Sequence, residues 1–307
     1  MNARSRGARA APGRGLECAA RAAAWGCALA VTLPVAFLVG YLVYEAGPAL
    51  GGDLFFGDVP ALAAILGQRP VWDGIWPACA GTLALVALTS AMAVPLGVAG
   101  GISLSLFARG RLRRLLRLGV DVLAGIPSIL MGLFGFALIL FLRRAFLPQA
   151  NTCLLLAAVS MALLILPYVV GATAGALDAL PDAMRLLGPS LGLSTWRTVA
   201  GVLVPEARRG ILGGIILAVG RACEDTAVIL MTGVVVGAGL PSGLFGKFEA
   251  LPFYIYYTSA QYQTPDELNR VYGAALVLLC LAVGLFLCAR VGSRLVEGRY
   301  GMTEAMR

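Results

Sequence analysis

Three charged residues inside one apolar stretch are the strongest candidates for chemistry in this sequence. Arg221, Glu224 and Asp225 lie within a mainly apolar run at residues 210–236. Their spacing of i, i+3 and i+4 predicts that they share one face of a helix. Charged side chains in such a helix usually face a bundle interior or a water-filled path. Two interpretations stay open: an internal ion pair that braces the bundle, or a pathway in which Arg221 donates charge-assisted hydrogen bonds to an oxyanion.

A short polar segment at residues 181–210 precedes that run. Pro181 suits the first turn of a short helix, and Gly192 suits the end of that helix. Ser194 suits the N-terminus of a second short helix, and Pro205 would begin the next one. The side chains expected to be exposed on this segment are those of Asp182, Arg185, Trp196 and Arg197. Such a pair of helices would form either a knob that fits a groove on a cytoplasmic protein or an ordinary connector at the membrane surface.

The composition predicts the elements that must position these residues. Of the 307 residues, 59% are hydrophobic and only 13% are charged, whereas soluble domains carry about 25% charged residues. A helix that crosses a membrane needs about 20 apolar residues. The runs of sufficient length are 25–45, 76–107, 120–142, 152–177, 210–236 and 271–289. We therefore expect an all-α polytopic membrane protein with six transmembrane helices.

The placement of arginine predicts the orientation of these helices. With six spans, both termini lie on one side of the membrane, and most of the arginines fall on that side, which predicts cytoplasmic termini. The chain then divides into a basic N-terminal arm at 1–24, a transmembrane domain at 25–295 and a C-terminal tail at 296–307. No cleavable signal peptide is expected, and the arm is expected to lie on an anionic membrane surface and not to bind nucleic acid.

Several chemistries lack the residues that they require. A phosphate-binding P-loop needs G-x-x-x-x-G-K-[ST], but the only lysine, Lys247, is followed by Phe248. Energy for active transport would therefore have to come from a partner or an ion gradient. Histidine is absent and the seven cysteines form no C-x-x-C pair, so we expect no metal site and no cofactor bound by this chain.

Several motifs resemble those of binding-protein-dependent ABC importer permeases. The sequence LGLSTWRT at 191–198, followed by Val204-Pro205, resembles the coupling loop of that family. The motifs that narrow the resemblance to phosphate importer permeases of the Pst type are GIPSI at 125–129, GLFG at 132–135, GTL at 81–83, PLG at 95–97, GRA at 220–222 and DTA at 225–227. The pairs LP at 251–252 and IY at 255–256 favour the A permease over its C partner. The resemblance covers about residues 72–295.

The resemblance implies a type I ABC importer permease fold with a coupling loop at about 180–209, and it implies residue roles. The residues on the translocation path would be Arg221, Glu224, Asp225 and Thr226. The residues that couple to an ATPase would be Asp182, Arg185, Gly192, Ser194, Trp196 and Arg197. The residues of a pore or packing motif would be Pro127, Ser128, Gly132 and Gly135. Relatives usually carry a glutamate and two small residues where this chain has Leu186, Leu187 and Gly188, and Pro189 follows directly.

The same resemblance implies an assembly in a bacterial inner membrane. A second, similar permease would pair with this chain, a dimer of ATPase subunits would use ATP and Mg²⁺, and a soluble phosphate-binding protein would deliver phosphate outside. The chain itself would not be an enzyme. The alternatives are a permease for another oxyanion, such as sulfate, molybdate, tungstate or phosphonate, and, from a different class, an ion-driven secondary carrier or a membrane scaffold.

Overall fold

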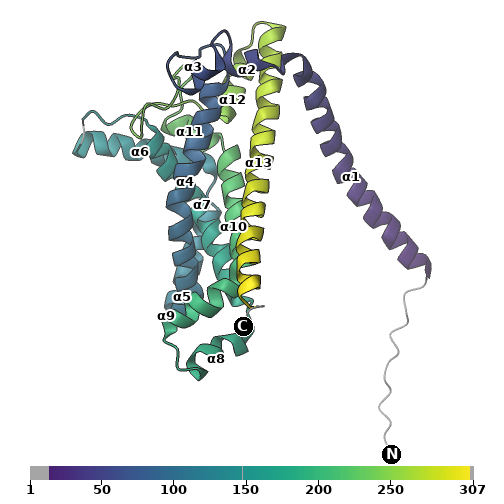
Figure 1. The fold of residues 1–307 in the computed structure, drawn as a ribbon, viewed down its shortest axis with the longest axis vertical. Helices are drawn as coiled ribbons and strands as arrows, with labels where there is room; N and C mark the ends of the chain where they lie inside the picture. The colour runs from purple at the N-terminus through teal and green to yellow at the C-terminus, as the bar shows by residue number, and fades with distance from the viewer. Residues whose placement is uncertain (1–13, 147, 305–307) are drawn as a thin grey trace, which may run out of the picture.

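The structure is a computed structural model that describes residues 14–146 and 148–304, and most of these residues lie in helices. Within the described ranges no strand forms, apart from one isolated bridge between Val234 and Phe248. The all-α prediction is therefore confirmed. The helices of the central bundle are α4 (Trp76–Ile102), α7 (Leu154–Asp178), α10 (Val204–Glu224) and α13 (Pro265–Glu304). They run side by side along the long axis of the molecule (Figure 1).

The first helix, α1 (Arg14–Ala46), diverges from this bundle (Figure 1). It meets α13 near its own C-terminal end, where the rings of Tyr41 and Tyr272 pack edge to face with centroids 5.9 Å apart. No residue in the most apolar part of α1 is buried within the chain. Because this surface is apolar along its length, it requires lipid or another subunit around it.

The two termini of the described chain are more helical than expected. Helix α1 begins at Arg14, inside the predicted arm at 1–24; residues 1–13 lie outside the described residues. Helix α13 continues through the predicted tail as far as Glu304, and residues 305–307 again lie outside the description.

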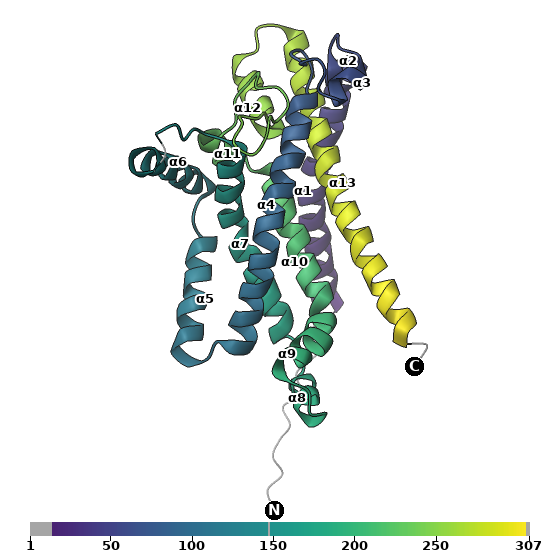
Figure 2. The same cartoon turned by 60° about the vertical axis from the view of Figure 1, so that its left-hand side comes forward.

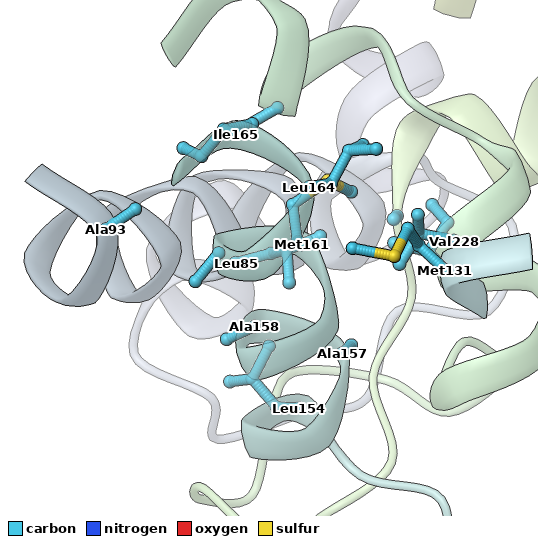
Figure 3. Close-up of a cluster of buried hydrophobic side chains, with 14 of the residues drawn as sticks. Leu85, Ala93, Met131, Leu154, Ala157, Ala158, Met161, Leu164, Ile165 and Val228 are labelled. Atoms are coloured by element: carbon cyan, nitrogen blue, oxygen red, sulfur yellow. The ribbon is translucent and has the colours of Figure 1, made fainter. Parts of the chain in front are cut away.

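Small residues bring the bundle helices together. Gly97 and Gly101 on α4 face Val169 and Thr173 on α7 so closely that a Cβ on either glycine would overlap these side chains. Because lipid provides no hydrophobic drive between spans, such close backbone approach is a main source of packing energy in membranes. The buried cluster in Figure 3 lies at this junction, between α4, α7 and their neighbours. Its labelled members are Leu85, Ala93, Met131, Leu154, Ala157, Ala158, Met161, Leu164, Ile165 and Val228.

Replacing Gly97 with leucine is expected to destabilise this junction. A Cβ at Gly97 would lie 2.6 Å from the Cβ of Val169, and overpacking of this kind costs about 1–3 kcal/mol. The midpoint of thermal unfolding of the purified chain in detergent should fall. Gly171→Leu is the matched control, because a Cβ at Gly171 on α7 meets nothing within 4 Å. Equal midpoints for the two variants would contradict the packing assignment.

The third predicted run, residues 120–142, is not one helix. It divides at residues 125–127 into α5 (Gly110–Ala124) and α6 (Ser128–Ala145). Figure 2 shows α5 along the bundle and α6 turned outward from it. The physical cause is Pro127, which has no N–H to continue the helical bonds and which disfavours a helical backbone at the residue before it.

The number of spans also differs from the expected six. Five helices of the described chain are long and apolar enough to cross a membrane. They are Glu17–Ala49, Trp76–Phe107, Ser128–Ala145, Leu154–Asp178 and Pro265–Cys288. The predicted run at 210–236 is not among them, because it is interrupted at Asp225. The prediction of a multi-pass helical membrane protein holds, whereas the division into spans was wrong at these two places.

The segment before α10 is more continuous than predicted. Helix α9 (Thr195–Thr198), the π-helical turn η3 (Val199–Leu203) and α10 follow one another without leaving helical backbone angles. Pro205 therefore lies in the first turn of α10 and does not begin a separate helix, as proline is tolerated there. A similar π-helical turn, η2 (Ser103–Phe107), extends α4.

The loops at the opposite end of the bundle contain short elements. They are η1 (Gly47–Ala49), α2 (Gly52–Phe56), α3 (Ala61–Ile65), α11 (Ala227–Thr232) and α12 (Leu251–Gln261). The LP pair at 251–252 and the IY pair at 255–256 thus both lie in a helix, α12. Its first residues, Leu251 and Pro252, are buried, whereas Tyr256 and Tyr257 are exposed.

The segment between α11 and α12 supplies hydrogen-bond acceptors to the N-terminus of α7. The backbone N–H of Leu154 donates to the carbonyl of Gly246 (3.1 Å), and that of Leu155 donates to the carbonyl of Leu244 (2.8 Å). These bonds satisfy N–H groups that have no partner inside the helix. On α4, the hydroxyl of Thr82 accepts from the backbone N–H of Leu251 (2.9 Å). The GTL motif at 81–83 therefore anchors the start of α12 to α4.

One carboxyl group in this segment is buried. Glu249 is 8% exposed, and its Oε1 accepts from the backbone N–H of Gly239 (2.9 Å). Burial raises the pKa of the Glu249 carboxyl, while the backbone N–H groups of Gly239, Ala238 and Gly237 act in the opposite direction. Gly237 and Gly239 both have positive φ, 69° and 74°, which lets the chain curl around the carboxylate.

Candidate functional site

Arg221 and Glu224 lie in the last turn of α10, and both are exposed at the surface of the described chain. Together with Tyr168 on α7 and Phe286 on α13 they line a cavity of about 280 Å³. Such a volume holds several water molecules, at about 30 Å³ each. Glu224 also borders a second, mainly apolar cavity of about 340 Å³ between α1 and α13. The two charges therefore face solvent-accessible space.

Arg221 is held by an aromatic ring and not by a carboxylate. Its guanidinium lies 5.0 Å from the centroid of the Tyr168 ring, in cation–π geometry. The hydroxyl of Tyr168 donates to the carbonyl of Ala124 at 3.4 Å, next to the break between α5 and α6. Among the described residues, Arg221, Glu224 and Asp225 form no ion pair with one another. This arrangement therefore gives no support to the interpretation of an internal ion pair, and the role of the three residues stays a prediction.

Asp225 does not share a helical face with Arg221, contrary to the prediction from spacing. Helix α10 ends at Glu224, and Asp225 has an extended backbone (φ −75°, ψ 117°). Its Oδ1 accepts from the backbone N–H of Val228 (3.0 Å) and so satisfies a free donor at the start of α11. A short carboxylate that bonds the backbone three residues ahead competes with helix continuation, which explains why the run at 210–236 divides here. Thr226 lies in the turn and is half-buried.

The predicted pore or packing motif, at residues 127–135 after the break between α5 and α6, packs α6 against α11. Pro127 precedes the first residue of α6, Ser128. A Cβ at Gly132 would lie 2.8 Å from the carbonyl oxygen of Ala227, and one at Gly135 would overlap Ser160 and Thr232. The two glycines therefore let α6 lie directly on the helix that Asp225 caps, which connects this motif with the turn after Arg221.

The predicted coupling segment lies at the end of the molecule remote from α2 and α3 (Figure 2). Helix α8 (Asp182–Ser190) is closed by Gly192, two residues after its end, where φ is +71°. The backbone N–H of Leu193 donates to the carbonyl of Gly188 (2.9 Å), the bond that closes a left-handed helix end. The hydroxyl of Ser194 then accepts from the backbone N–H of Arg197 (3.4 Å) at the start of α9. The predicted helix end and the predicted cap are both confirmed.

The tip of this segment exposes large apolar side chains. Trp196 is 67% exposed and Leu191 is 73% exposed. Further exposed residues on the segment are Asp182, Leu186, Leu187, Gly192, Ser194 and Arg197. Exposed apolar side chains mark surfaces that another molecule covers, and tryptophan and arginine, here Trp196 and Arg197, are enriched where proteins bind one another.

Arg185 was predicted to be exposed for coupling, but it is half-buried and turned inward. Its Nη2 donates to the carbonyl of Leu177 (3.1 Å) and lies 3.6 Å from Oδ1 of Asp178, at the end of α7. The same carboxylate is bound by Arg113 on α5 at 2.7 Å. Sequence reasoning missed Asp178 and Arg113. The one signal available was that Asp178 is an acidic residue at the end of an apolar run beside a basic segment.

The matched region of the chain identifies its family. Residues 93–301 match the family described as the binding-protein-dependent transport system inner membrane component. The chain belongs to this family. The match extends from the second half of α4 into α13, and it includes α8 and the turn after Arg221. The family resemblance inferred from the motifs is confirmed.

Several relatives of the chain are named as phosphate transport permeases. A protein named phosphate transport system permease protein PstA 1, from Mycobacterium tuberculosis, is 34% identical over 221 residues, which are 70% of this chain and 69% of that protein. PstA of Pasteurella multocida is 27% identical over 253 residues, 80% of this chain and 83% of that protein. A PstC permease of Mesorhizobium japonicum is 32% identical over 169 residues, 48% of this chain and 52% of that protein. The chain is thus PstA-like.

Solved structures of low sequence identity share the fold. The MetNI methionine ABC transporter contains a chain with a TM-score of 0.54 and 18% identity, covering 78% of this chain and 99% of that chain. A bacterial importer of the acidic polysaccharide alginate gives a TM-score of 0.52 at 12% identity, covering 87% of this chain and 95% of that chain. The predicted permease fold is therefore confirmed.

Proposed function

We propose that this chain is a membrane-spanning subunit of an ABC importer that translocates inorganic phosphate. The observation that carries the proposal is the 34% identity to PstA 1 of Mycobacterium tuberculosis over about 70% of each chain. The family match at 93–301 covers both the turn that presents Arg221 and the segment around α8. A similarity restricted to the packing of the bundle would not argue for a substrate.

The proposed path runs along the uncovered face of α7 and α10. Tyr168, Gly171 and Gly175 follow one another at i, i+3 and i+7 and so lie on one face of α7. Gly171 and Gly175 are exposed and have open space in front of them. Arg221 lies over Tyr168 beside this face. We propose that a second, similar permease covers the face and that phosphate passes between the two subunits.

Arg221 supplies the chemistry that phosphate recognition needs. A guanidinium offers five N–H donors in a planar fork that matches phosphate oxygens. The Tyr168 ring holds this group without neutralising it, whereas a carboxylate partner would cancel its charge. Glu224 on the same cavity makes the local net charge close to zero, so we expect the second permease to contribute further donors. Asp225 acts through the backbone of α11 and not as a ligand.

Energy would be supplied at the opposite end of the chain. We propose that the tip formed by residues 182–198 faces the cytoplasm, together with both termini, in a bacterial inner membrane. The exposed Leu191 and Trp196 would fit a groove on an ATPase subunit, two copies of which would bind ATP and Mg²⁺. ATP must favour one arrangement of the helices over the other, because a ligand of equal affinity for both shifts nothing. A soluble phosphate-binding protein would deliver the ion at the end formed by α2, α3 and α12.

The test is uptake of radiolabelled phosphate by phosphate-starved cells from which the gene has been deleted and then restored. We expect uptake to be lost on deletion and recovered on restoration. Arsenate, the isosteric analogue, should compete, whereas excess sulfate or molybdate should not. Unchanged phosphate uptake in a strain without a second phosphate importer would contradict the substrate while leaving the permease fold unaffected.

A further inference from the structure

We propose that Asp178 is a positioning residue that joins the coupling segment to two bundle elements, so that α8, the end of α7 and α5 move as one unit during transport. The inference rests on the proposed function, because it concerns how motion at an ATPase would reach the path. It assigns a role to Asp178 and Arg113, which the motifs of the family did not indicate.

The geometry that carries the inference is a carboxylate with partners on three different elements. Its Oδ2 accepts from Nη2 of Arg113 on α5 at 2.7 Å. Its Oδ1 accepts from the hydroxyl of Ser105 in η2 at 2.6 Å. Nη2 of Arg185 on α8 lies 3.6 Å from the same Oδ1. The contacts with Ser105 and Arg113 bridge 73 and 65 residues of chain, so Asp178 connects elements that are remote in sequence.

Arg185 links α8 to the end of α7 by a second contact. The same nitrogen that approaches Asp178 donates to the carbonyl of Leu177 at 3.1 Å. This carbonyl belongs to the last turn of α7, where backbone acceptors have no partner inside the helix and where a cation is favoured by the helix dipole. The guanidinium of Arg185 therefore holds α8 to α7 through one hydrogen bond to the backbone and one ion pair with Asp178.

The surroundings make these bonds stronger than ordinary surface pairs. The side chains of Arg113, Asp178 and Arg185 are 37%, 28% and 32% exposed, and two guanidinium groups share one carboxylate. Partial burial reduces solvent screening of the pairs. Without the negative charge, the two cations would repel each other across the junction between α5 and α8. The charge of Asp178 thus holds the arginines of α5 and α8 together at the end of α7.

A rigid attachment at this point has a mechanical consequence. α8 carries the exposed tip, and α5 leads directly to the break at residues 125–127 and to the Ala124 carbonyl that binds Tyr168. Tyr168 in turn holds Arg221. A displacement of α8 is therefore passed through Asp178 to α5 and to the aromatic ring beneath Arg221. Without this attachment, α8 would move without shifting α5.

The variant that tests the inference is Asp178→Asn, which keeps the shape and the acceptor for Ser105 but removes the charge. The complete complex is reconstituted in liposomes, and phosphate import is measured per ATP hydrolysed. We expect this ratio to fall at least about fivefold, the lower end of typical coupling between sites. Arg113→Gln should reproduce the loss, and the double variant should add little to it. Arg117→Gln, on the same helix and with no recorded ion pair, is the matched control and should keep the wild-type ratio.

If Asp178 only stabilised the fold, Asp178→Asn would lower the amount of assembled complex. ATP hydrolysis and phosphate import would then fall together, and the ratio of phosphate imported to ATP hydrolysed would stay at the wild-type value. That outcome overturns the inference. If the wild-type complex hydrolyses ATP but imports no phosphate, the proposed substrate fails, and the inference is then decided by a second measurement that needs no substrate.

That second measurement is the distance between two spin labels, one at Ala183 on α8 and one at Leu116 on α5, both exposed positions, in a chain from which the native cysteines have been removed. In the assembled complex the distance should stay the same when ATP is added, because the two helices move together. In Asp178→Asn it should change with ATP. A distance that changes with ATP in the parent complex, or that stays the same in the variant, overturns the inference.

Discussion

Replacing Arg221 with alanine is expected to reduce phosphate uptake roughly 10- to 100-fold at substrate concentrations below saturation. The estimate follows from the loss of hydrogen bonds to a charged group, worth about 1.5–3 kcal/mol, at about 1.4 kcal/mol for each tenfold change in affinity. Arg221 is the cation that lines the cavity between α7, α10 and α13. Without it, Glu224 would leave that cavity with a net negative charge, which opposes the entry of an anion.

The measurement is the initial rate of uptake against phosphate concentration, normalised to the amount of assembled complex in the membrane. Arg221→Lys is the conservative variant. It keeps the charge but loses the planar fork and the stacking on Tyr168, so we expect an intermediate rate. Normal uptake by Arg221→Ala would exclude a pathway role. A loss of uptake that only follows a loss of complex would instead make Arg221 an assembly residue.

The parts of the structure that sequence predicted well depend on local interactions. Gly192 ends α8 because a left-handed backbone at the end of a helix favours glycine. Ser194 caps α9 through a bond to a residue only three positions away. The runs at 25–45, 76–107, 152–177 and 271–289 each lie almost entirely in a candidate span, as their apolar length predicts. Each of these features is decided within a few residues, so the sequence contains enough information to predict it.

The parts that sequence failed to predict depend on which of two local options the rest of the fold selects. Asp225 fits the i+4 position of a helix that contains Arg221, yet it also fits the cap of a following helix. The second option is realised because α11 lies against α6 at Gly132 and Gly135, a contact between segments far apart in the chain. The spacing of charges alone does not distinguish these options.

Asp178 was missed by sequence-based prediction for a different reason. Its partners Ser105 and Arg113 lie far away in sequence, so no spacing rule connects them. The same contact explains why Arg185, predicted at the exposed tip, is turned toward the bundle. Five arginines lie at residues 109–117, and in the sequence they contributed only to the prediction of orientation. In the structure one of these arginines, Arg113, binds the carboxylate of Asp178 at the end of α7.

Replacing Gly192 with valine is expected to weaken binding of the ATPase and to reduce uptake. Gly192 has a φ of +71°, and a β-branched residue is a genuine outlier there. Side chains in this region cost roughly 1–2 kcal/mol, which corresponds to about a 5- to 30-fold shift in an equilibrium. The turn that orients Leu191 and Trp196 relative to α8 would open, and the apolar tip would lose its shape.

The controls separate backbone strain from the other effects of a new side chain. A Cβ at Gly192 meets nothing within 4 Å, so the first side-chain carbon fits, and we expect any loss to come from the backbone or from the partner. Asparagine tolerates a left-handed backbone, and Gly192→Asn should therefore bind the ATPase and import phosphate nearly as the parent does.

Co-purification of the ATPase with each variant, together with uptake, gives the comparison. Equal losses for both variants would mean that the partner has no room for a side chain at this position. Two fully active variants would show that the turn at Gly192 does not shape the docking surface.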